Sequence, residues 1–331
     1  MTLDARFAAL ARHDQDRLLI ELVRAGDTAE LGTPVDGEPP EVTAARLFAE
    51  LAGIPFDGAA RAEPGSEWQT EVLDLPAYLR RVGWVGEAPP PSLESLRALH
   101  WAHLTAIGFH NLDVLLGRPI SHELPDIQRK LVAARKPATC VEHNLLFAAV
   151  LERLGFAVTR LAGRPRIGRP VVLPATHAAL LVTLPEGDYL VDVGVGGDAP
   201  IEPVSLAGGE TGRDAWLWRV VEDAGTWVLE VSRPEGWVAL YSFDVLPQRL
   251  ADYLLTYYYS VTYPGIPIAY KVVASRVTAD VRHVLTGDRY TRTTSAGDAE
   301  TRTLDGPEVV SVLTEVFGAR LSDDEWKTVL R

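Results

Sequence analysis

The chain has 331 residues and a formal net charge of −13, with 47% hydrophobic and 23% charged residues. This composition is typical of a globular protein with two or three domains. The sequence has no basic run, so we do not expect nucleic-acid binding. The single cysteine excludes an intramolecular disulfide and a cysteine-based zinc site, and we expect no metal centre. Because no stretch resembles a signal peptide or a membrane span, we expect a cytoplasmic protein without membrane association.

Residues 1–77 differ from the remainder in charge. They hold fifteen acidic and six basic residues and thus carry nine of the thirteen net negative charges. Apolar residues at helical spacing predict a helix over 5–25, and a Gly/Pro-rich loop and a second helix over 43–51 follow. We therefore expect residues 1–77 to form an acidic helical extension.

The rest of the chain changes from helical to strand patterns. Residues 78–165 are predicted to be mainly helical, with helices at 76–82, 93–107 (capped by Ser92) and 126–135. Residues 166–250 favour strands, and residues 185–188 are typical of a hairpin connection. The expected strands lie at 176–184, 189–195, 216–221, 227–231, 237–241, 270–278 and 288–294, and further helices lie at 247–255 and 307–316.

The only cysteine, Cys140, lies at the predicted start of a helix. Thr139 can cap this helix, Glu142 three residues later completes a capping box, and Gly155 ends it. Free N–H groups and the positive end of the helix dipole favour a thiolate at this position, which suits a nucleophile of acyl transfer. The alternative is a small buried hydrophobic residue, which is a common role for a lone cysteine.

His177 and Asp192 lie on the two strands of the predicted hairpin. Each has a structural alternative, as a hydrogen-bonded core histidine or as a strand-end aspartate. In the simplest register Asp192 faces Leu181, four residues from His177, or roughly 13 Å along the strand. Spacing alone therefore does not join them, and His143, one helical turn from Cys140, is a rival base by proximity.

From about residue 78 to the end, the chain resembles the arylamine N-acetyltransferases. The ordered Cys, His and Asp with their flanking residues make the resemblance specific over roughly three quarters of the chain. The matching stretches are residues 78–84, residues 93–118 with Phe109-His110-Asn111-Leu112-Asp113, Cys140-Val141-Glu142-His143-Asn144-Leu145-Leu146-Phe147, Leu154-Gly155-Phe156, Thr176-His177, Val191-Asp192-Val193-Gly194, Tyr241-Ser242-Phe243-Asp244 and Pro247-Gln248.

This resemblance implies an α+β fold with a papain-like triad on three domains. They are a helical bundle at 78–157 bearing Cys140, a β-barrel at 158–255 bearing His177 and Asp192, and an α/β lid at 256–331. Cys140 is then the nucleophile, His177 takes its proton, and Asp192 orients the imidazole. The resemblance implies no permanently bound cofactor, an acyl thioester as donor and an amine as acceptor.

Several residues depart from the family pattern near the expected cleft. Lys136-Pro137-Ala138 replaces Arg-Gly-Gly, His110 replaces the glutamate of Phe-Glu-Asn, and Val195 replaces a phenylalanine. Tyr257 and Val261 stand where the family has asparagine and serine. These departures question acetyl-CoA as the donor. The substrate-binding candidates are Phe109, His110, Val195, Tyr257 and Thr262.

A second resemblance concerns the N-terminal extension. Residues 17–24, Leu31-Gly32, residues 47–51 and Phe56-Asp57-Gly58 resemble the first half of a polyketide acyl carrier protein, with Gly58 in place of the serine that carries phosphopantetheine. Together with the altered cleft, this favours an amide synthase of the ansamycin type. Such an enzyme takes its acyl chain from a carrier protein, as a phosphopantetheine thioester, and closes a macrolactam on an intramolecular amine.

Two alternatives remain at this stage. One is a conventional acetyl-CoA:arylamine N-acetyltransferase that acts on small arylamines. The other is a non-catalytic module that binds an acyl chain or a carrier protein. Pro137 and Ala138 motivate the second alternative, because neither can copy a glycine-only backbone conformation, and a displaced Cys140 would not align with His177.

Overall fold

The structure is a computed structural model that describes residues 66–166, 172–263 and 266–330. Residues 65–331 form one compact unit of the chain. The helices expected over 5–25 and 43–51, and the stretches that resemble a carrier protein, lie outside the described residues. The predicted role of residues 1–77 therefore stays a prediction.

Helices surround the residue Cys140 at the N-terminal end of this unit. After the short 3-10 helices η2 (Ser66–Trp68) and η3 (Thr70–Val72) come α4 (Leu75–Arg81), α5 (Leu93–Ala106), α7 (Leu124–Gln128), the π-helical turn η4 (Arg129–Ala133) and α8 (Cys140–Arg153). Ser92 caps α5 as predicted, since its side chain accepts a hydrogen bond from Ser95 N. Helix α8 is buried without interruption from Val141 to Leu151, so it is the central helix and not an amphipathic surface helix.

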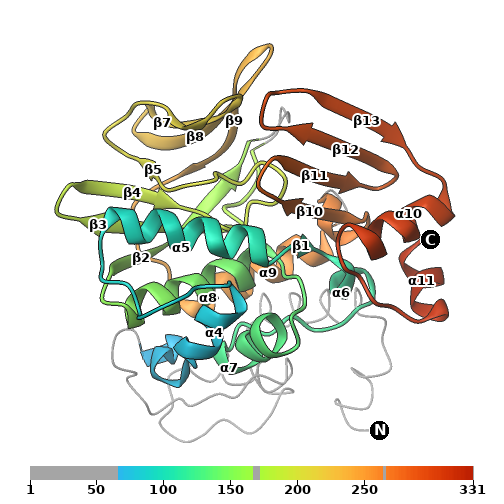
Figure 1. The fold of residues 1–331 in the computed structure, drawn as a ribbon, viewed down its shortest axis with the longest axis horizontal. Coiled ribbons are helices and arrows are strands. Elements are labelled where there is room, and N and C mark those ends of the chain that lie inside the picture. Colours follow the sequence, from blue (N-terminus) through green and yellow to red (C-terminus); the bar gives the residue numbers. More distant parts are fainter. Residues whose placement is uncertain (1–65, 167–171, 264–265, 331) are drawn as a thin grey trace, which may run out of the picture. The chain divides into compact units, whose positions relative to one another are not determined.

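An antiparallel sheet of eight strands follows, with the order β5-β4-β3-β2-β9-β8-β7-β6. Figure 1 shows α5 and α8 lying across β2, β3 and β4. The prediction of mainly helical structure up to residue 165 is wrong for β2, because the β-branched Val158 and Thr159 pair with β3 in the middle of the sheet. The strands are β2 (Ala157–Pro165), β3 (His177–Leu184), β4 (Gly187–Val191), β5 (Val204–Ser205), β6 (Thr211–Arg213), β7 (Trp216–Asp223), β8 (Thr226–Arg233) and β9 (Gly236–Phe243).

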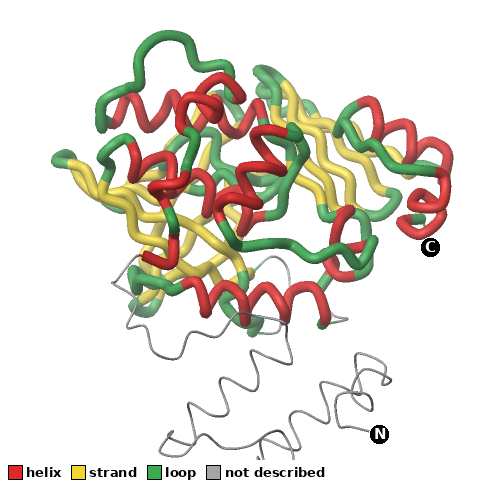
Figure 2. Tube along the Cα trace, turned by 90° about the horizontal axis from the view of Figure 1, so that it is seen from below, coloured by secondary structure: helices red, strands yellow, loops and turns green. Residues whose placement is uncertain are grey.

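A second antiparallel sheet has the order β1-β10-β11-β12-β13. Its first strand, β1 (Phe109–His110), comes from the helical part and pairs with β10, so segments about 160 residues apart lie side by side. The other elements are α6 (Leu112–Leu115), α9 (Leu250–Thr262), η5 (Pro267–Ala269), β10 (Val273–Val277), β11 (Val281–Thr286), β12 (Arg289–Thr294), β13 (Ala299–Thr303), α10 (Gly306–Glu315) and α11 (Asp323–Val329). In Figure 2 the two C-terminal helices lie beside this sheet.

The described part of the chain has three hydrophobic clusters, one around α8, one inside the eight-stranded sheet and one between the second sheet and α10. The α+β architecture expected from the sequence is confirmed by this arrangement and by the solved relatives described below. The three expected domains stay a prediction, and their inner boundaries, 157/158 and 255/256, fall inside β2 and α9. No helix in the described ranges is long and apolar enough to cross a membrane.

The hairpin that carries His177 has a tighter turn than the sequence suggested. Leu184 pairs with Gly187, so only Pro185 and Glu186 form the connection, and Leu180 pairs with Val191. The expected four-residue connection is therefore wrong, and the register moves by two residues. Asp192, directly after β4, becomes level with Ala179 instead of Leu181, which brings it two residues closer to His177 along β3.

Buried ion pairs hold the N-terminus of α8. The predicted capping box is present, and Glu142 Oε2 accepts hydrogen bonds from Thr139 N at 2.9 Å and from Thr139 Oγ1 at 3.0 Å. The other oxygen of Glu142 pairs with Lys130 Nζ at 2.8 Å, and Lys130 also contacts Asp113 at 2.9 Å. Although burial lowers the pKa of Lys130, these two carboxylates raise it, so the ammonium stays charged.

We predict that Lys130→Met lowers the free energy of unfolding by about 3 kcal/mol, because it leaves the buried Glu142 carboxylate without its cation. Urea denaturation measures the change. Arg129→Met is the matched control, since its side chain is 72% exposed and its ion pair with Asp126 is on the surface, so it should change stability by less than about 0.5 kcal/mol. Equal effects of the two substitutions would contradict the anchoring role.

Candidate active site

Cys140 is the first residue of α8 and is half-buried. The segment after β4 approaches it so closely that only glycine fits at position 194. A Cβ atom there would lie 2.7 Å from the carbonyl oxygen of Cys140 and 2.8 Å from Asn144 Nδ2. This approach brings the chain that carries Asp192 onto the first turn of the helix.

The structure brings Cys140, His177 and Asp192 together. The His177 Nε2 atom lies 2.6 Å from Asp192 Oδ2, and the Cys140 side chain lies close enough to His177 to help raise its pKa. Burial lowers the pKa of His177, but the Asp192 carboxylate and the Cys140 side chain more than offset this and raise it to about 10. Burial raises the pKa of Asp192, and the charge of His177 and the hydrogen bonds to the carboxylate lower it overall. The pair is thus a buried imidazolium–carboxylate pair.

Two further side chains contact Asp192, and sequence analysis missed both. Tyr241 Oη donates to Oδ2 at 2.8 Å, and Asn144 Nδ2 donates to Oδ1 at 3.0 Å. Gly194 N also donates to Oδ1, at 2.8 Å, so each carboxylate oxygen accepts two hydrogen bonds. Burial and the charge of Asp192 raise the pKa of Tyr241, which keeps it a neutral donor. The available signals were local: Asn144 lies one helical turn after Cys140, and Tyr241 opens a matching stretch.

His143, the rival base, belongs to a separate chain of hydrogen bonds. Its Nε2 contacts the carbonyl oxygen of Gly108 at 3.2 Å, and its Nδ1 lies 2.9 Å from His103 Nε2, while His103 Nδ1 contacts Tyr78 Oη at 2.9 Å. Because a carbonyl only accepts, Nε2 of His143 carries the proton. Burial lowers the pKa of His143 to about 4. Both ring nitrogens are engaged elsewhere, whereas His177 is the histidine beside Cys140.

The five candidate binding residues lie in different surroundings, and not all of them are near Cys140. Phe109 is buried, and its ring stacks on the His143 ring with the planes at 9° and the ring centroids 6.4 Å apart. Val195 is half-buried against the hydrophobic cluster inside the eight-stranded sheet. His110 is buried on β1, and burial lowers its pKa to about 4. Tyr257 lines the cavity beside Cys140. Thr262 is exposed on α9, and its hydroxyl donates to the carbonyl of Tyr258 at 2.7 Å, so the structure does not bring it to Cys140.

Pro137 and Ala138 do not displace Cys140 from His177. Ala138 is buried and forms two backbone hydrogen bonds of 3.1 Å, one to Gly108 O and one from His110 N. These bonds fix the residues before α8 to β1. The displacement that motivated the non-catalytic alternative is therefore not present.

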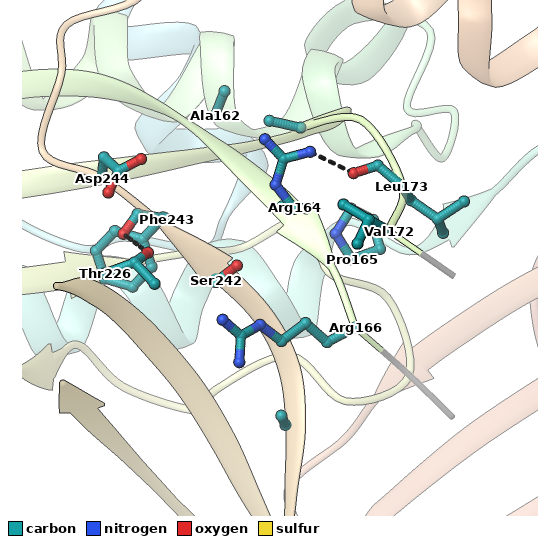
Figure 3. Close-up of a pocket in the computed structure, with 12 residues that line it drawn as sticks. Ala162, Arg164, Pro165, Arg166, Val172, Leu173, Thr226, Ser242, Phe243 and Asp244 are labelled. Atoms are coloured by element: carbon teal, nitrogen blue, oxygen red, sulfur yellow. Dashed lines mark hydrogen bonds between the residues drawn. The ribbon is translucent and has the colours of Figure 1, made fainter. Parts of the chain in front are cut away.

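The cavity beside Cys140 has a volume of about 20 Å³ and is lined by one face of α9 together with residues 139–141, Thr176 and Ile268. A larger cavity of about 610 Å³ lies at the edge of the barrel, where Arg164, Ser242 and Asp244 face it and Arg164 donates to the carbonyl of Leu173 (Figure 3). Cys140 does not line this second cavity. Within the described ranges, no group of three or more His, Cys, Asp or Glu side chains could hold a metal ion.

The sequence is similar to those of known proteins. An N-acetyltransferase family model matches residues 92–326. The arylamine N-acetyltransferase of Escherichia coli is 35% identical over 254 residues, which cover 74% of this chain and 89% of that protein. A Mycobacterium tuberculosis relative of the same name is 34% identical over 258 residues, which cover 76% and 91%. The chain belongs to the arylamine N-acetyltransferase family.

Solved structures of this family agree with the fold. The arylamine N-acetyltransferase of Nocardia farcinica has a TM-score of 0.74 and 36% identity, and the match covers 82% of this chain and 98% of that one. The Mycobacterium marinum enzyme, solved in complex with CoA, has a TM-score of 0.72 and 33% identity over 78% of this chain and 98% of that one. The chain is thus an acyltransferase that acts on amines.

We predict that His177 stays an imidazolium up to about pH 10 in the folded enzyme, whereas Asp192→Asn lowers its pKa because burial is then no longer offset. Nitrogen NMR of labelled histidine measures both titrations. His283, which lies on β11 and makes no hydrogen bond to Asp192, is the internal control and should titrate identically in the two proteins.

The same shift makes stability depend on pH. The folded pKa of His177 lies above its ordinary value of 6.5, so its stabilisation is complete below pH 6.5 and disappears as the pH rises toward 10. The difference in unfolding free energy between wild type and Asp192→Asn should therefore shrink between pH 6.5 and pH 10. A difference that grows over this range would contradict the assignment.

Proposed function

We propose that this enzyme transfers an acetyl group from acetyl-CoA to a small arylamine through an acyl-cysteine at Cys140. The observation that carries the proposal is the contact of Cys140 with His177, whose other ring nitrogen is bonded to the buried Asp192. The names of the relatives and the CoA complex of the Mycobacterium marinum enzyme support the choice of donor and acceptor.

In the first half-reaction, His177 already holds the proton of Cys140 as an imidazolium, and the sulfur reacts as a thiolate. Because Nε2 is bonded to Asp192, Nδ1 is the ring nitrogen left to hold this proton. The sulfur attacks the thioester carbonyl carbon, a new C–S bond forms, and the bond from that carbon to the sulfur of CoA breaks. The leaving thiolate takes the proton from His177. N–H groups at the start of α8 have no intrahelical partner and suit the negative oxygen of the intermediate.

In the second half-reaction, the amine nitrogen attacks the carbonyl carbon of the acyl-cysteine. A C–N bond forms, the C–Sγ bond breaks to release the Cys140 thiolate, and the amine gives one proton to His177, which becomes the imidazolium again. Asp192 holds the imidazole in one orientation and stabilises its charged form in both halves, while Tyr241 and Asn144 fix the carboxylate. These residues make the site rigid before substrate arrives.

The comparisons favour the conventional alternative over the amide synthase that sequence analysis preferred. The relatives described above carry the name arylamine N-acetyltransferase, and none of these names mentions a carrier protein. The departures at His110, Val195 and Tyr257 remain, but they do not by themselves require a long acyl chain. A small cavity beside Cys140 also suits a short acyl group better than a polyketide.

The test is intact-protein mass spectrometry after incubation with acetyl-CoA and without amine. Wild type should gain the mass of one acetyl group, Cys140→Ala should gain none, and His177→Gln should gain it far more slowly. Adding 4-aminobenzoate, a simple arylamine, should then remove the acetyl group and yield the amide. Acylation by carrier-bound thioesters but not by acetyl-CoA would instead support the amide synthase. No acylation by either donor would overturn the proposal.

A further inference from the structure

One face of α9 lines the cavity beside Cys140. The residues of this helix that line the cavity beside Cys140 follow the spacing i, i+3, i+4, i+7 and i+8, which is one side of an α-helix. They are Tyr253, Thr256, Tyr257, Ser260 and Val261. The opposite side points to solvent, with Leu255 71% exposed and Tyr258 37% exposed.

The space that α9 leaves is very small. The cavity volume of about 20 Å³ is close to the roughly 10–15 Å³ that a single water molecule requires. An acetyl group on Cys140 is larger than a water molecule, so even the smallest acyl-cysteine requires the wall to move slightly. Each additional methylene requires a larger displacement.

Of the five α9 side chains that line the cavity, Tyr257 is the large one that is not fully buried, so it can set the size limit. Tyr253 is buried, and its hydroxyl donates to the carbonyl of Leu161 at 2.8 Å, so it anchors the helix. Thr256 and Ser260 are small and donate to backbone carbonyls of α9. Tyr253 is also the only buried residue of α9 among its thirteen, which leaves the part that carries Tyr257 held less firmly.

The ring of Tyr257 has a defined support. It packs edge-to-face on His122, with ring centroids 5.0 Å apart and planes at 70°. His122 is buried, and burial lowers its pKa to about 4, so the ring behind Tyr257 is neutral at pH 7. The contact is therefore an aromatic one that fixes the position of the Tyr257 ring as a wall of the cavity.

We propose that Tyr257, supported by His122, limits the length of the acyl group that Cys140 accepts. Acetyl and similarly short groups require only a small shift of the ring, whereas a chain of six or more carbons collides with it. This inference rests on the proposed function, since it assigns the acyl-size range of the same site. It makes Tyr257 a specificity-determining residue.

The experiment compares a series of donors on the full-length protein. Acetyl-, butanoyl-, hexanoyl- and octanoyl-CoA are each mixed with enzyme in a single turnover, and the rate of Cys140 acylation is followed by mass spectrometry. We expect Tyr257→Ala to raise the octanoyl-to-acetyl rate ratio at least about tenfold, since steric exclusion from a pocket is worth this much. Tyr258→Ala, the neighbouring tyrosine that does not line the cavity, should keep the wild-type ratio.

Two more variants separate size from other effects. Tyr257→Phe keeps the ring and should keep the wild-type ratio, whereas Tyr257→Leu should be intermediate and replaces Tyr257→Ala if that variant does not fold. An unchanged ratio in both small variants, or wild type accepting octanoyl as fast as acetyl, overturns the inference. If acetyl-CoA does not acylate the enzyme, the proposed function fails, and the same series as pantetheine thioesters then tests the size limit by itself.

Discussion

The Asp192 carboxylate is the interaction on which the rest of the site depends. It is fully buried, and isolated burial of such a charge costs several kcal/mol unless it is paired and hydrogen-bonded. The structure satisfies it from four places: His177 on β3, Tyr241 on β9, Asn144 on α8 and the backbone of Gly194. The eight-stranded sheet and the central helix α8 therefore share one set of hydrogen bonds, which holds Cys140 beside His177.

The histidines show why this carboxylate decides the chemistry. His103, His143 and His122 are buried, and burial lowers the pKa of each, so they are neutral and act in packing and hydrogen bonding. His177 is equally buried but has a raised pKa because it contacts Asp192. Among the described histidines with a resolved shift it is the one whose pKa rises. Burial removes the charge from a histidine, and a buried carboxylate restores it.

Family membership indicates the class of reaction, and the geometry of the cavity indicates the size of the acyl group. The relatives indicate acyl transfer to amines, and the arrangement around Cys140 supports an acyl-cysteine intermediate. On the half-buried helix α9, Tyr257 lines the cavity beside Cys140. In our proposal this side chain, and not Cys140, His177 or Asp192, limits the size of the acyl group, so the acyl size can change without changing the chemistry.

The sequence by itself determined the features that depend on a few neighbouring residues. The capped start of α8 at Cys140, its end at Gly155 and the cap of α5 at Ser92 follow from contacts within three or four positions. The fold class and the family came from ordered motifs. Strand pairing could not be derived in this way, because the register of β3 and β4 depends on whether the turn has two or four residues.

Only the tertiary structure decided which side chains meet. Tyr241 and Asn144 could not be joined to Asp192 from the sequence, because 49 and 48 residues separate them from it and the contacts form only when β9 and α8 pack on the end of β4. The packing of Tyr253 sets the rotation of α9 about its axis. Helical spacing then places Tyr257 on the side of the cavity beside Cys140 and Thr262 on the solvent side. Neighbouring residues in the sequence predicted Cys140 as the candidate nucleophile. Long-range packing determined which side chains meet Asp192, because a buried charge needs hydrogen-bond donors and these come from distant parts of the chain.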